Sequence, residues 1–289
     1  MFTIESHLLK AVIHPKGAEL QSLVHKETGI EYMWKGDPAV WGKHSPVLFP
    51  IVGALKENTY LYQGETYQLP RHGFARDHQF AVESQDFDRI VFLLKQDEST
   101  LKTFPFFFDF RIGYTILESS IAVTYEVENT GDGTMYFSVG GHPAFALPLV
   151  LDNAYDDYFL EFDQEENTGR WPIADGGLLK TSAIPFLNDS KLLPLDKSLF
   201  ASDALVFKNL KSSAVSLRSH QSSHGLKMDF PGFPYLGIWA APNADFLCIE
   251  PWCGIADSVD TMQQLEEKEG INKLEPGEKF TRSWTVTVF

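Results

Sequence analysis

The sequence predicts an all-β protein, built as a large antiparallel β-sandwich from two extensive sheets. Runs of strand length, rich in β-branched and aromatic residues, are separated by turn residues roughly every eight to twelve positions, as in sandwiches and barrels. Sequence with a helical period is scarce. No linker and no change in composition divides the 289 residues, so we expect a single domain over residues 1–289.

The predicted strands follow one another along the chain, beginning with a hairpin over residues 2–14. They cover residues 2–7, 9–14, 18–24, 31–34, 59–62, 66–69, 79–83, 89–94, 110–117, 120–128, 236–239, 246–250 and 279–289. Two segments are predicted to be helical: residues 262–270, where Gly270 would end two turns, and residues 153–157. The aromatic run at residues 104–108 (FPFFF) is predicted to pack in the core.

The charge of the chain excludes several classes of partner. Its 24 basic and 39 acidic residues give a net charge of −15, which argues against nucleic acid or an anionic membrane as partner. The N-terminus lacks the features of a signal peptide, and no run approaches the roughly 20 apolar residues of a membrane helix. We therefore expect a cytoplasmic protein. Its oligomeric state stays open, a homodimer included.

The first candidate site residue is His142, near the middle of the chain. Residues 136–145 (YFSVGGHPAF) carry a predicted strand into two glycines, and Pro143 then stops regular pairing. The glycines leave space beside the imidazole. An incidental histidine at a hairpin end is the alternative.

A second histidine, His72, lies between Arg71 and Arg76 in the run RHGFAR. The nearby positive charges favour its neutral form, which is a good hydrogen-bond partner for a hydroxyl. The two arginines could hold a carboxylate or an anionic ligand group. A solvated basic surface loop is the alternative.

The third candidate is Glu250, which is predicted to end an apolar strand just before Pro251 and Trp252. Partial desolvation beside the indole would raise the pKa of this carboxyl toward a value useful for a base. A carboxylate that points to water is the alternative.

Together, His72, His142 and Glu250 allow two kinds of chemistry. A metal site with two histidines and one carboxylate is the weaker hypothesis, because the three residues lie on distant segments. Acid–base work without a metal is favoured, and Phe74, Phe145 and Trp252 would suit the C–H face of a sugar ring. Cys248 and Cys253 lack the spacing of a metal or redox pair, and no base for a thiol nucleophile is evident.

Several of these runs, in order, resemble the aldose 1-epimerase (galactose mutarotase-like) family in its LacX-type branch. The resemblance spans essentially the whole chain and rests on these runs: residues 17–20 (GAEL), 71–76 (RHGFAR), 140–145 (GGHPAF), 202–207 (SDALVF), 249–254 (IEPWCG) and 274–278 (LEPGE). It implies a single supersandwich with a sugar site in a cleft on one sheet, and no cofactor and no metal.

The resemblance also implies roles for individual residues. Glu250 matches the family's general base, His142 its general acid and His72 a second histidine near the sugar ring oxygen. Asp203 matches an aspartate that holds substrate hydroxyls. A donor His142 would need its pKa raised by an acidic neighbour.

One position departs from the family pattern. Where the family has an arginine, this chain has Ala54, with Lys56 two residues on, and Arg71 or Arg76 could fill the space. Lys56, Arg71, Arg76 and Trp252 are therefore predicted, with Asp203, to contact the substrate. We therefore carry three functions forward. The first is mutarotation of a free aldose, the second is mutarotation of a hexose phosphate held by the two arginines, and the third is sugar binding without catalysis.

Overall fold

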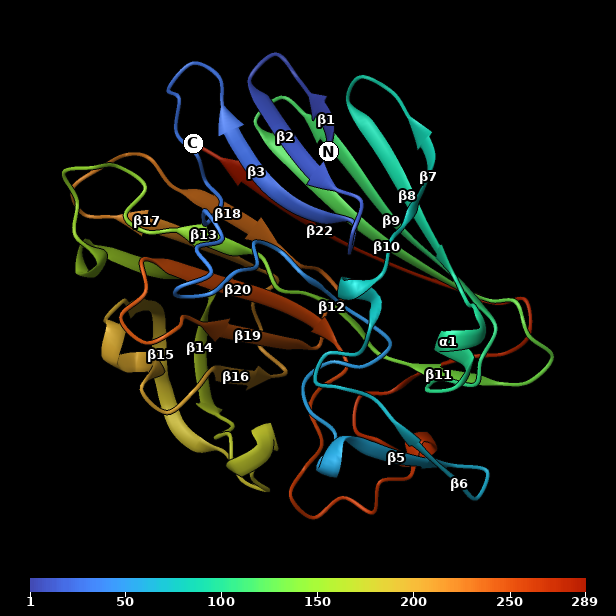
Figure 1. The fold of residues 1–289 in the computed structure, drawn as a ribbon. Coiled ribbons are helices and arrows are strands. Elements are labelled where there is room, and N and C mark those ends of the chain that lie inside the picture. The colour runs from blue at the N-terminus through green and yellow to red at the C-terminus, as the bar shows by residue number, and fades with distance from the viewer.

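The computed structural model describes residues 1–289 and confirms an all-β fold with antiparallel pairing throughout its sheets (Figure 1). A nine-stranded sheet has the order β15-β14-β17-β18-β22-β10-β9-β8-β7, and a six-stranded sheet has the order β16-β19-β20-β12-β4, with β13 also paired to β20. Strands β1 to β3 form a third sheet, and β5-β6 and β11-β21 are two-stranded.

The elements have the following bounds. The strands are β1 (Phe2–Glu5), β2 (Leu9–His14), β3 (Glu19–His25), β4 (Val47–Leu48), β5 (Thr59–Tyr62), β6 (Glu65–Gln68), β7 (Ala81–Gln85), β8 (Arg89–Lys95), β9 (Phe108–Leu117), β10 (Ser120–Asn129), β11 (Met135–Phe137), β12 (Val139–Gly141), β13 (Ala144–Ala146), β14 (Tyr158–Arg170), β15 (Ile184–Pro194), β16 (Leu205–Lys208), β17 (Ala214–Ser219), β18 (Leu226–Asp229), β19 (Tyr235–Trp239), β20 (Phe246–Cys253), β21 (Asn272–Leu274) and β22 (Lys279–Val288). The helical elements are η1 (Lys56–Asn58), η2 (Ala75–Asp77), α1 (Glu98–Leu101), η3 (Tyr155–Asp157), η4 (Asp175–Gly177), η5 (Lys197–Phe200) and η6 (Leu265–Glu267).

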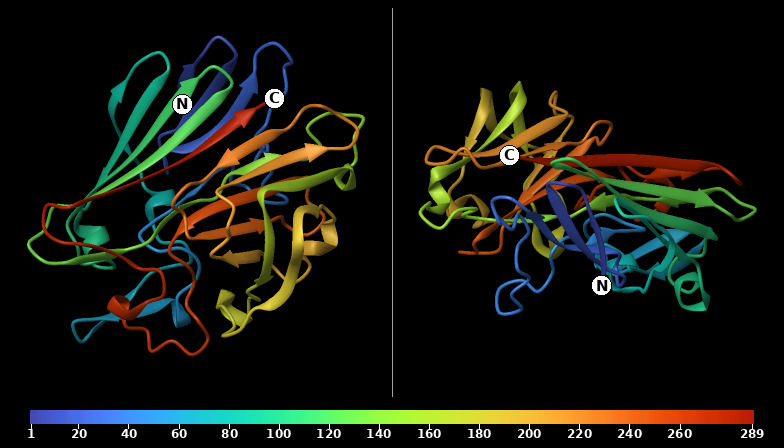
Figure 2. Two further views of the ribbon diagram at one scale, coloured as in Figure 1. Left: turned by 180° about the vertical axis from the view of Figure 1, so that it is seen from behind. Right: turned by 90° about the horizontal axis from the view of Figure 1, so that it is seen from above.

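The nine-stranded sheet packs against the six-stranded sheet through one of its faces, and along its strands buried and less buried residues alternate. In β10 every second residue is buried, because successive side chains of a strand point to opposite faces. Tyr125 of β10 accepts a hydrogen bond from the indole of Trp284 in β22 at 2.9 Å. Gly141 of β12 lies directly against both side chains, and its missing Cβ permits this close approach. Viewed from above, β1 to β3 lie in a layer beneath β10 and β22 (Figure 2).

Strand β20 lies in the middle of the six-stranded sheet, and all eight of its residues are buried. Its partner on one side is β19, and on the other side β12 and β13 share it. The chain leaves the sheet between β12 and β13, at His142 and Pro143. Pro251 lies opposite this interruption, where a missing N–H removes no ladder hydrogen bond.

The structure corrects four local predictions. Glu250 does not end its strand, because β20 continues to Cys253. Residues 31–34 form only isolated bridges, from Glu31 to Val24 and from Met33 to Phe145. The two predicted helices are single 3₁₀ turns, η6 and η3. By contrast, the aromatic run is confirmed as core, since Phe104, Phe106 and Phe108 are buried and only Phe107 is half exposed. None of the helices has the length and apolar character needed to cross a bilayer.

Candidate active site

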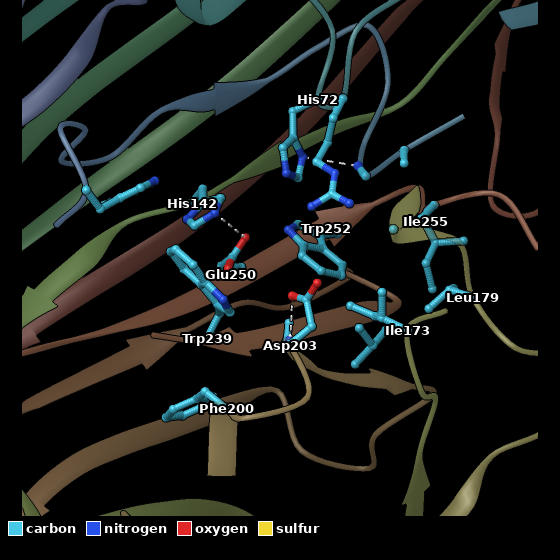
Figure 3. A pocket seen from close by; sticks show the side chains of 18 of the residues that line it. His72, His142, Ile173, Leu179, Phe200, Asp203, Trp239, Glu250, Trp252 and Ile255 are labelled. Carbon is cyan, nitrogen blue, oxygen red and sulfur yellow. Dashed lines mark hydrogen bonds and ion pairs between the residues drawn. The ribbon is translucent and has the colours of Figure 1, made fainter. Parts of the chain in front are cut away.

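A cavity of about 520 Å³ opens on the six-stranded sheet beside β20. The segments that line it are far apart in the sequence and meet around the interruption between β12 and β13 (Figure 3). Its lining residues are Trp41, Gly53, Ala54, Arg71, His72, Arg76, His142, Ile173, Gly177, Leu179, Phe200, Ala201, Asp203, Ala204, Val206, Trp239, Pro242, Glu250, Trp252, Ile255 and Ala256. Seven of the eight predicted site residues are in this set, and Lys56 is not.

His142 and Glu250 are the one pair of acidic and basic side chains in the pocket lining that lie within contact distance of each other. Nε2 of His142 lies 3.4 Å from Oε2 of Glu250. The two residues are only 7% and 2% exposed, respectively. Glu250 is fixed by the ladder of β20, opposite Gly237 of β19, and His142 reaches it from the interruption next to the same strand. Neither Nδ1 of His142 nor Oε2 of Glu250 has a hydrogen-bond partner within the protein.

Aromatic rings fix the plane of His142. The indole of Trp41 stacks on it, with ring centroids 5.0 Å apart and an interplanar angle of 26°. The rings of Trp239 and His72 meet it edge to face, at 5.6 Å and 5.7 Å. An imidazole held on three sides has little freedom to leave Glu250.

Burial moves both members of the pair toward their neutral forms. Desolvation lowers the pKa of His142 to about 3, and the positive charge of Arg76 adds to this effect. Desolvation raises the pKa of Glu250 well above its usual value, and Asp203 adds to the rise, although the nearby Trp252 indole opposes it. The raised pKa that a proton-donating His142 would need is therefore absent in the free protein, because burial lowers the pKa instead.

His72 is a neutral hydrogen-bond donor. Its pKa lies well below the usual range because of burial first, and then because of His142, Arg76 and Arg71. Its Nδ1 accepts a hydrogen bond from the backbone N–H of Gly53 at 3.1 Å. In a neutral ring the proton then resides on Nε2. The residue has a positive φ of 68°, a backbone conformation that is uncommon without a local constraint.

The other predicted polar residues surround this centre. Asp203 has a φ of 79°, and its carboxylate accepts a hydrogen bond from the N–H of Ala204 at 2.8 Å. Arg76 is half-buried, and its Nη2 donates to the carbonyl of Arg71 at 2.8 Å. Arg71 is exposed, and its guanidinium lies against Gly177, where a Cβ would clash with it. Both arginines thus line the pocket, with Arg71 at its edge.

Trp252 forms the floor of the cavity because two glycines give it room. A Cβ on Gly140, directly opposite Trp252, would lie 2.7 Å from Cδ1 of the indole. A Cβ on Gly237 of β19 would clash with the six-membered ring. The indole can therefore lie flat across neighbouring strands, and this is the orientation that a stacked sugar ring needs.

Lys56 lies outside the pocket, contrary to the prediction that it contacts the sugar. Its ammonium donates to the carbonyl of Val259 at 3.4 Å, while its backbone N–H donates to Asp257 at 3.0 Å. Asp257 pairs in turn with the buried ammonium of Lys268 at 2.7 Å. This segment therefore supports the wall of the pocket from behind.

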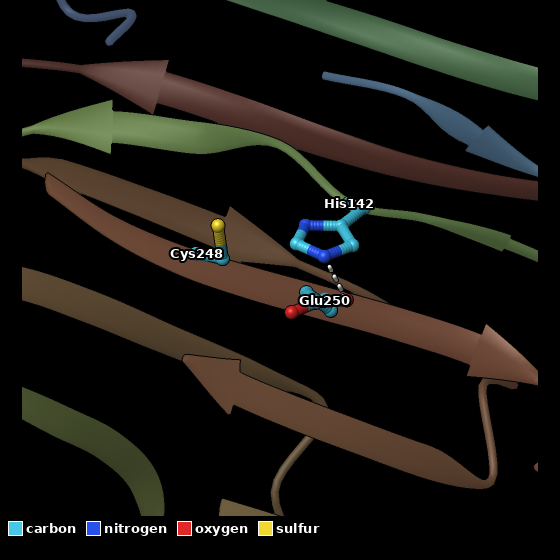
Figure 4. A group of neighbouring side chains, drawn as sticks. All are labelled: His142, Cys248 and Glu250. Carbon is cyan, nitrogen blue, oxygen red and sulfur yellow. Dashed lines mark ion pairs between the residues drawn. The ribbon is translucent and has the colours of Figure 1, made fainter. Parts of the chain in front are cut away.

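The donor set that could hold a metal ion differs from the one that the sequence indicated. His142, Cys248 and Glu250 place one donor atom each within 4.8 Å of one another (Figure 4). A mixed nitrogen, sulfur and oxygen set can suit zinc. However, burial raises the pKa of both the Cys248 thiol and the Glu250 carboxyl, so two of the three ligands would have to lose a proton at a site that favours neutral groups. The residues present therefore fit a metal poorly.

Sequence reasoning missed two aromatic members of the site and one entire side of it. Trp41 stacks on His142 from a loop that no strand pattern marks, and the sequence pattern predicts a strand at Trp239 but no role in the site. The apolar side, with Ile173, Leu179 and Ile255, comes from loops whose placement depends on tertiary packing. Of the residues on this side of the pocket, the sequence drew attention only to Ala54, because it departs from the family pattern.

Comparisons with known proteins agree with this fold and cover the whole chain. The family model described as "Aldose 1-epimerase" matches residues 1–282. The plasmid and chromosomal LacX proteins of Lactococcus lactis subsp. lactis are each 36% identical over 281 residues, which is 94% of this chain and 94% of theirs.

Two solved structures are also similar over nearly their full lengths. A galactose mutarotase related enzyme from Lactobacillus acidophilus is 39% identical, with a TM-score of 0.94 over 100% of this chain and 97% of that one. A galactose mutarotase-like protein from Lactobacillus casei is 31% identical, with a TM-score of 0.93 over 100% of both chains.

Proposed function

The chain belongs to the aldose 1-epimerase family, and on that premise we propose that it is a mutarotase, which interconverts the α and β anomers of a free aldose. The observation that carries the proposal is the buried contact between His142 and Glu250 on one side of a cavity floored by Trp252. Anomer exchange needs one group that accepts a proton from the C1 hydroxyl and one that donates a proton to the ring oxygen.

The spacing of the pair suits those two oxygens. The C1 hydroxyl oxygen and the ring oxygen are both bonded to C1, so the groups that serve them must also be neighbours. His142 and Glu250 are 3.4 Å apart. Glu250 would take the proton of the C1 hydroxyl and His142 would protonate the ring oxygen. The ring then opens, the C1–C2 bond rotates, and closure on the other carbonyl face reverses both transfers.

For this reaction His142 and Glu250 must together carry one proton, which is bound to one of the two side chains. Burial in the free protein favours that proton on Glu250. Moving it to His142 leaves the net charge of the pair unchanged and produces a carboxylate base beside an imidazolium acid. Sugar hydroxyls that donate hydrogen bonds to the carboxylate favour this ionised arrangement. His72 would donate from Nε2 to a sugar oxygen, and Asp203 would accept from sugar hydroxyls.

The decisive test is Glu250→Gln, followed by polarimetry of freshly dissolved α-glucose and α-galactose. We expect kcat/KM to fall by about 10²- to 10⁴-fold, as for the loss of one positioned proton transfer. Glu118→Gln, on an exposed turn, is the matched control and should keep wild-type activity. A Glu250→Gln protein with near wild-type rates would show that the base is assigned wrongly.

Two further functions each have an observation in their favour. Arg71 and Arg76 both line the pocket, which favours a hexose phosphate; glucose 6-phosphate would then be interconverted faster than glucose, and Arg71→Gln would abolish the difference. Ala54 stands in place of the family's arginine, which favours sugar binding without catalysis. That function predicts measurable sugar affinity with no acceleration above the rate in buffer.

A further inference from the structure

The pocket has a polar half and an apolar half, which lie on opposite sides of the Trp252 indole (Figure 3). His142 and Glu250 belong to the polar half, and Ile173, Leu179 and Ile255 gather on the other side. The apolar half is continuous with a second, small hydrophobic cluster that is separate from the main core. The aliphatic residues of this cluster that line the pocket are Ile173, Leu179, Ala204, Val206, Ile255 and Ala256, and Ala54, outside the cluster, also lines the pocket.

The side chains of the apolar half offer no hydrogen bond to a ligand, and several of its backbone groups are already paired. The N–H of Leu179 donates to the carbonyl of Asp257 at 2.8 Å. The carbonyl of Ala54 accepts from the N–H of Asp257 at 2.9 Å, and the carbonyl of Val206 accepts from Trp171 at 2.8 Å. A hydroxyl buried here would lose its water without gaining a partner.

We propose that the substrate is an aldose with an apolar group in place of one of its outer hydroxyls, a 6-deoxyhexose being the simplest case. This inference rests on the proposed function, because the sugar must place its C1 hydroxyl and ring oxygen at His142 and Glu250. The C6 group is carried by C5, next to the ring oxygen, so a ring stacked on Trp252 with its C5 edge turned toward Ile255 and Leu179 would place C6 against that wall. A methyl group there gains apolar contacts, whereas a hydroxymethyl group loses hydrogen bonds.

Asp203, which precedes Ala204 in the chain, and Arg71 are the charged residues at the edge of this half. The guanidinium of Arg71 lies against Gly177, and the side chain is exposed. A 6-phosphate could reach it only from the rim, whereas Ile173, Leu179 and Ile255 line the interior. The hexose phosphate is therefore included in the test as the competing outcome.

The experiment compares sugars that differ only at C6. The probes are galactose with 6-deoxygalactose, in D and L forms, glucose with 6-deoxyglucose, and glucose 6-phosphate. Saturation-transfer NMR gives the exchange rates, and ligand-observed titration gives Kd. We expect the 6-deoxy member of at least one pair to be favoured in kcat/KM and Kd by about ten- to a hundredfold, the range for one apolar group or one unpaired hydroxyl in such a pocket.

The outcomes separate this inference from the proposed function. Tighter binding of a 6-deoxy sugar without faster exchange would reject the mutarotase and keep the apolar substrate class. If the protein accelerates anomer exchange, but acts on the parent hexose or on glucose 6-phosphate at least as well as on the 6-deoxy sugar, the proposed substrate class is rejected and the mutarotase is kept. Failure of every 6-deoxy sugar to bind also counts against the inference.

Two variants test whether the apolar half of the pocket causes the preference for a 6-deoxy sugar. Ile173→Thr keeps a β-branched side chain at a half-buried position and adds a hydroxyl to the apolar half. We expect it to reduce the 6-deoxy preference several-fold, mainly by improving use of the parent hexose. Ile184→Thr, at an exposed position of β15, is the control and should leave the ratio unchanged. If the ratio of kcat/KM for the 6-deoxy sugar to kcat/KM for its parent hexose is the same in wild type and in Ile173→Thr, the apolar half does not select the substrate.

Discussion

The ammonium of Lys268 lies 2.7 Å from the carboxylate of Asp257, and both side chains are almost completely buried. Lys268 also donates to the carbonyl of Ile255 at 2.7 Å, and Asp257 accepts from the N–H of Lys56 at 3.0 Å. One buried ion pair thus connects the segment after β20 to the loop that carries Ala54. These two segments form the wall of the pocket, so the pair holds the shape of a site that it does not touch.

Removing Lys268 should therefore destabilise the protein strongly. Lys268→Met leaves Asp257 as an uncompensated buried charge, and we expect a loss of about 3–5 kcal/mol in the free energy of unfolding. Urea denaturation measures it. Lys197→Met, which breaks an exposed pair with Asp245, should cost under about 1 kcal/mol. Equal effects of the two variants would show that the buried pair contributes no more than a surface pair.

The depressed pKa of His142 predicts a pH dependence of stability. A histidine with an unfolded pKa near 6.5 and a folded pKa of about 3 binds more protons when the chain is unfolded. Its contribution is fully present above pH 6.5 and is lost as the pH falls toward 3. Relative to His142→Gln, the wild type should lose up to about 1.4 kcal/mol per pH unit across this window.

Chemical denaturation at several pH values measures this difference. The exposed His7 supplies the control, because His7→Gln should follow the wild type at every pH. A constant difference between wild type and His142→Gln from pH 7 to pH 4 would contradict the depressed pKa.

The floor of the cavity should respond to a single methyl group. Gly237→Ala places a Cβ against the rigid indole of Trp252, and we expect a loss of about 1–3 kcal/mol in stability from overpacking. Sugar affinity should fall with it, because the tilted indole no longer supports the ring. Gly133→Ala is the matched control, since nothing lies near the added atom. Titration of each variant with the best sugar tests the effect; unaltered affinity in Gly237→Ala would argue against a flat-stacked ligand.

Both cysteines should be unreactive in the folded protein. Burial raises the pKa of Cys253 to about 11 and that of Cys248 well above its usual value. They cannot form a disulfide with each other, because they lie five positions apart on strand β20, which places their Cα atoms roughly 17 Å apart. We expect an aromatic disulfide reagent at pH 8 to titrate no thiol in the native protein and two after unfolding. A thiol that reacts before unfolding would show that β20 opens.

The sequence was informative where local patterns decide the structure. The alternation in β10 and β22 and the glycines before His142 are local signals, and they predicted two strands and the end of a third. Glu250 was placed on the right strand but at the wrong point, because Pro251 is a strong stop signal unless its missing N–H faces an interruption. That interruption is a tertiary feature. Residues 31–34 have the composition of a strand, but the fold gives them only bridge partners.

The family resemblance brought Glu250, His142, His72 and Asp203 into one hypothesis, and the structure places all four around one cavity. It could not place Trp41 or the apolar wall, because both depend on loops that cross the sheet. Nor could it give the direction in which the pKa of His142 is shifted. Neighbouring charges can be guessed from a sequence, whereas the degree of desolvation depends on how many other segments cover the group.

The glycines beneath Trp252 determine how this pocket can be modified. At Gly140 and Gly237 even the smallest enlargement would displace the indole, so the base of the binding site has no room for adjustment. The opposite holds for Ile173, whose half-buried side chain can change in size and polarity while the reacting groups stay in place. A programme to give this scaffold a different sugar preference should therefore begin at this position and leave both glycines untouched.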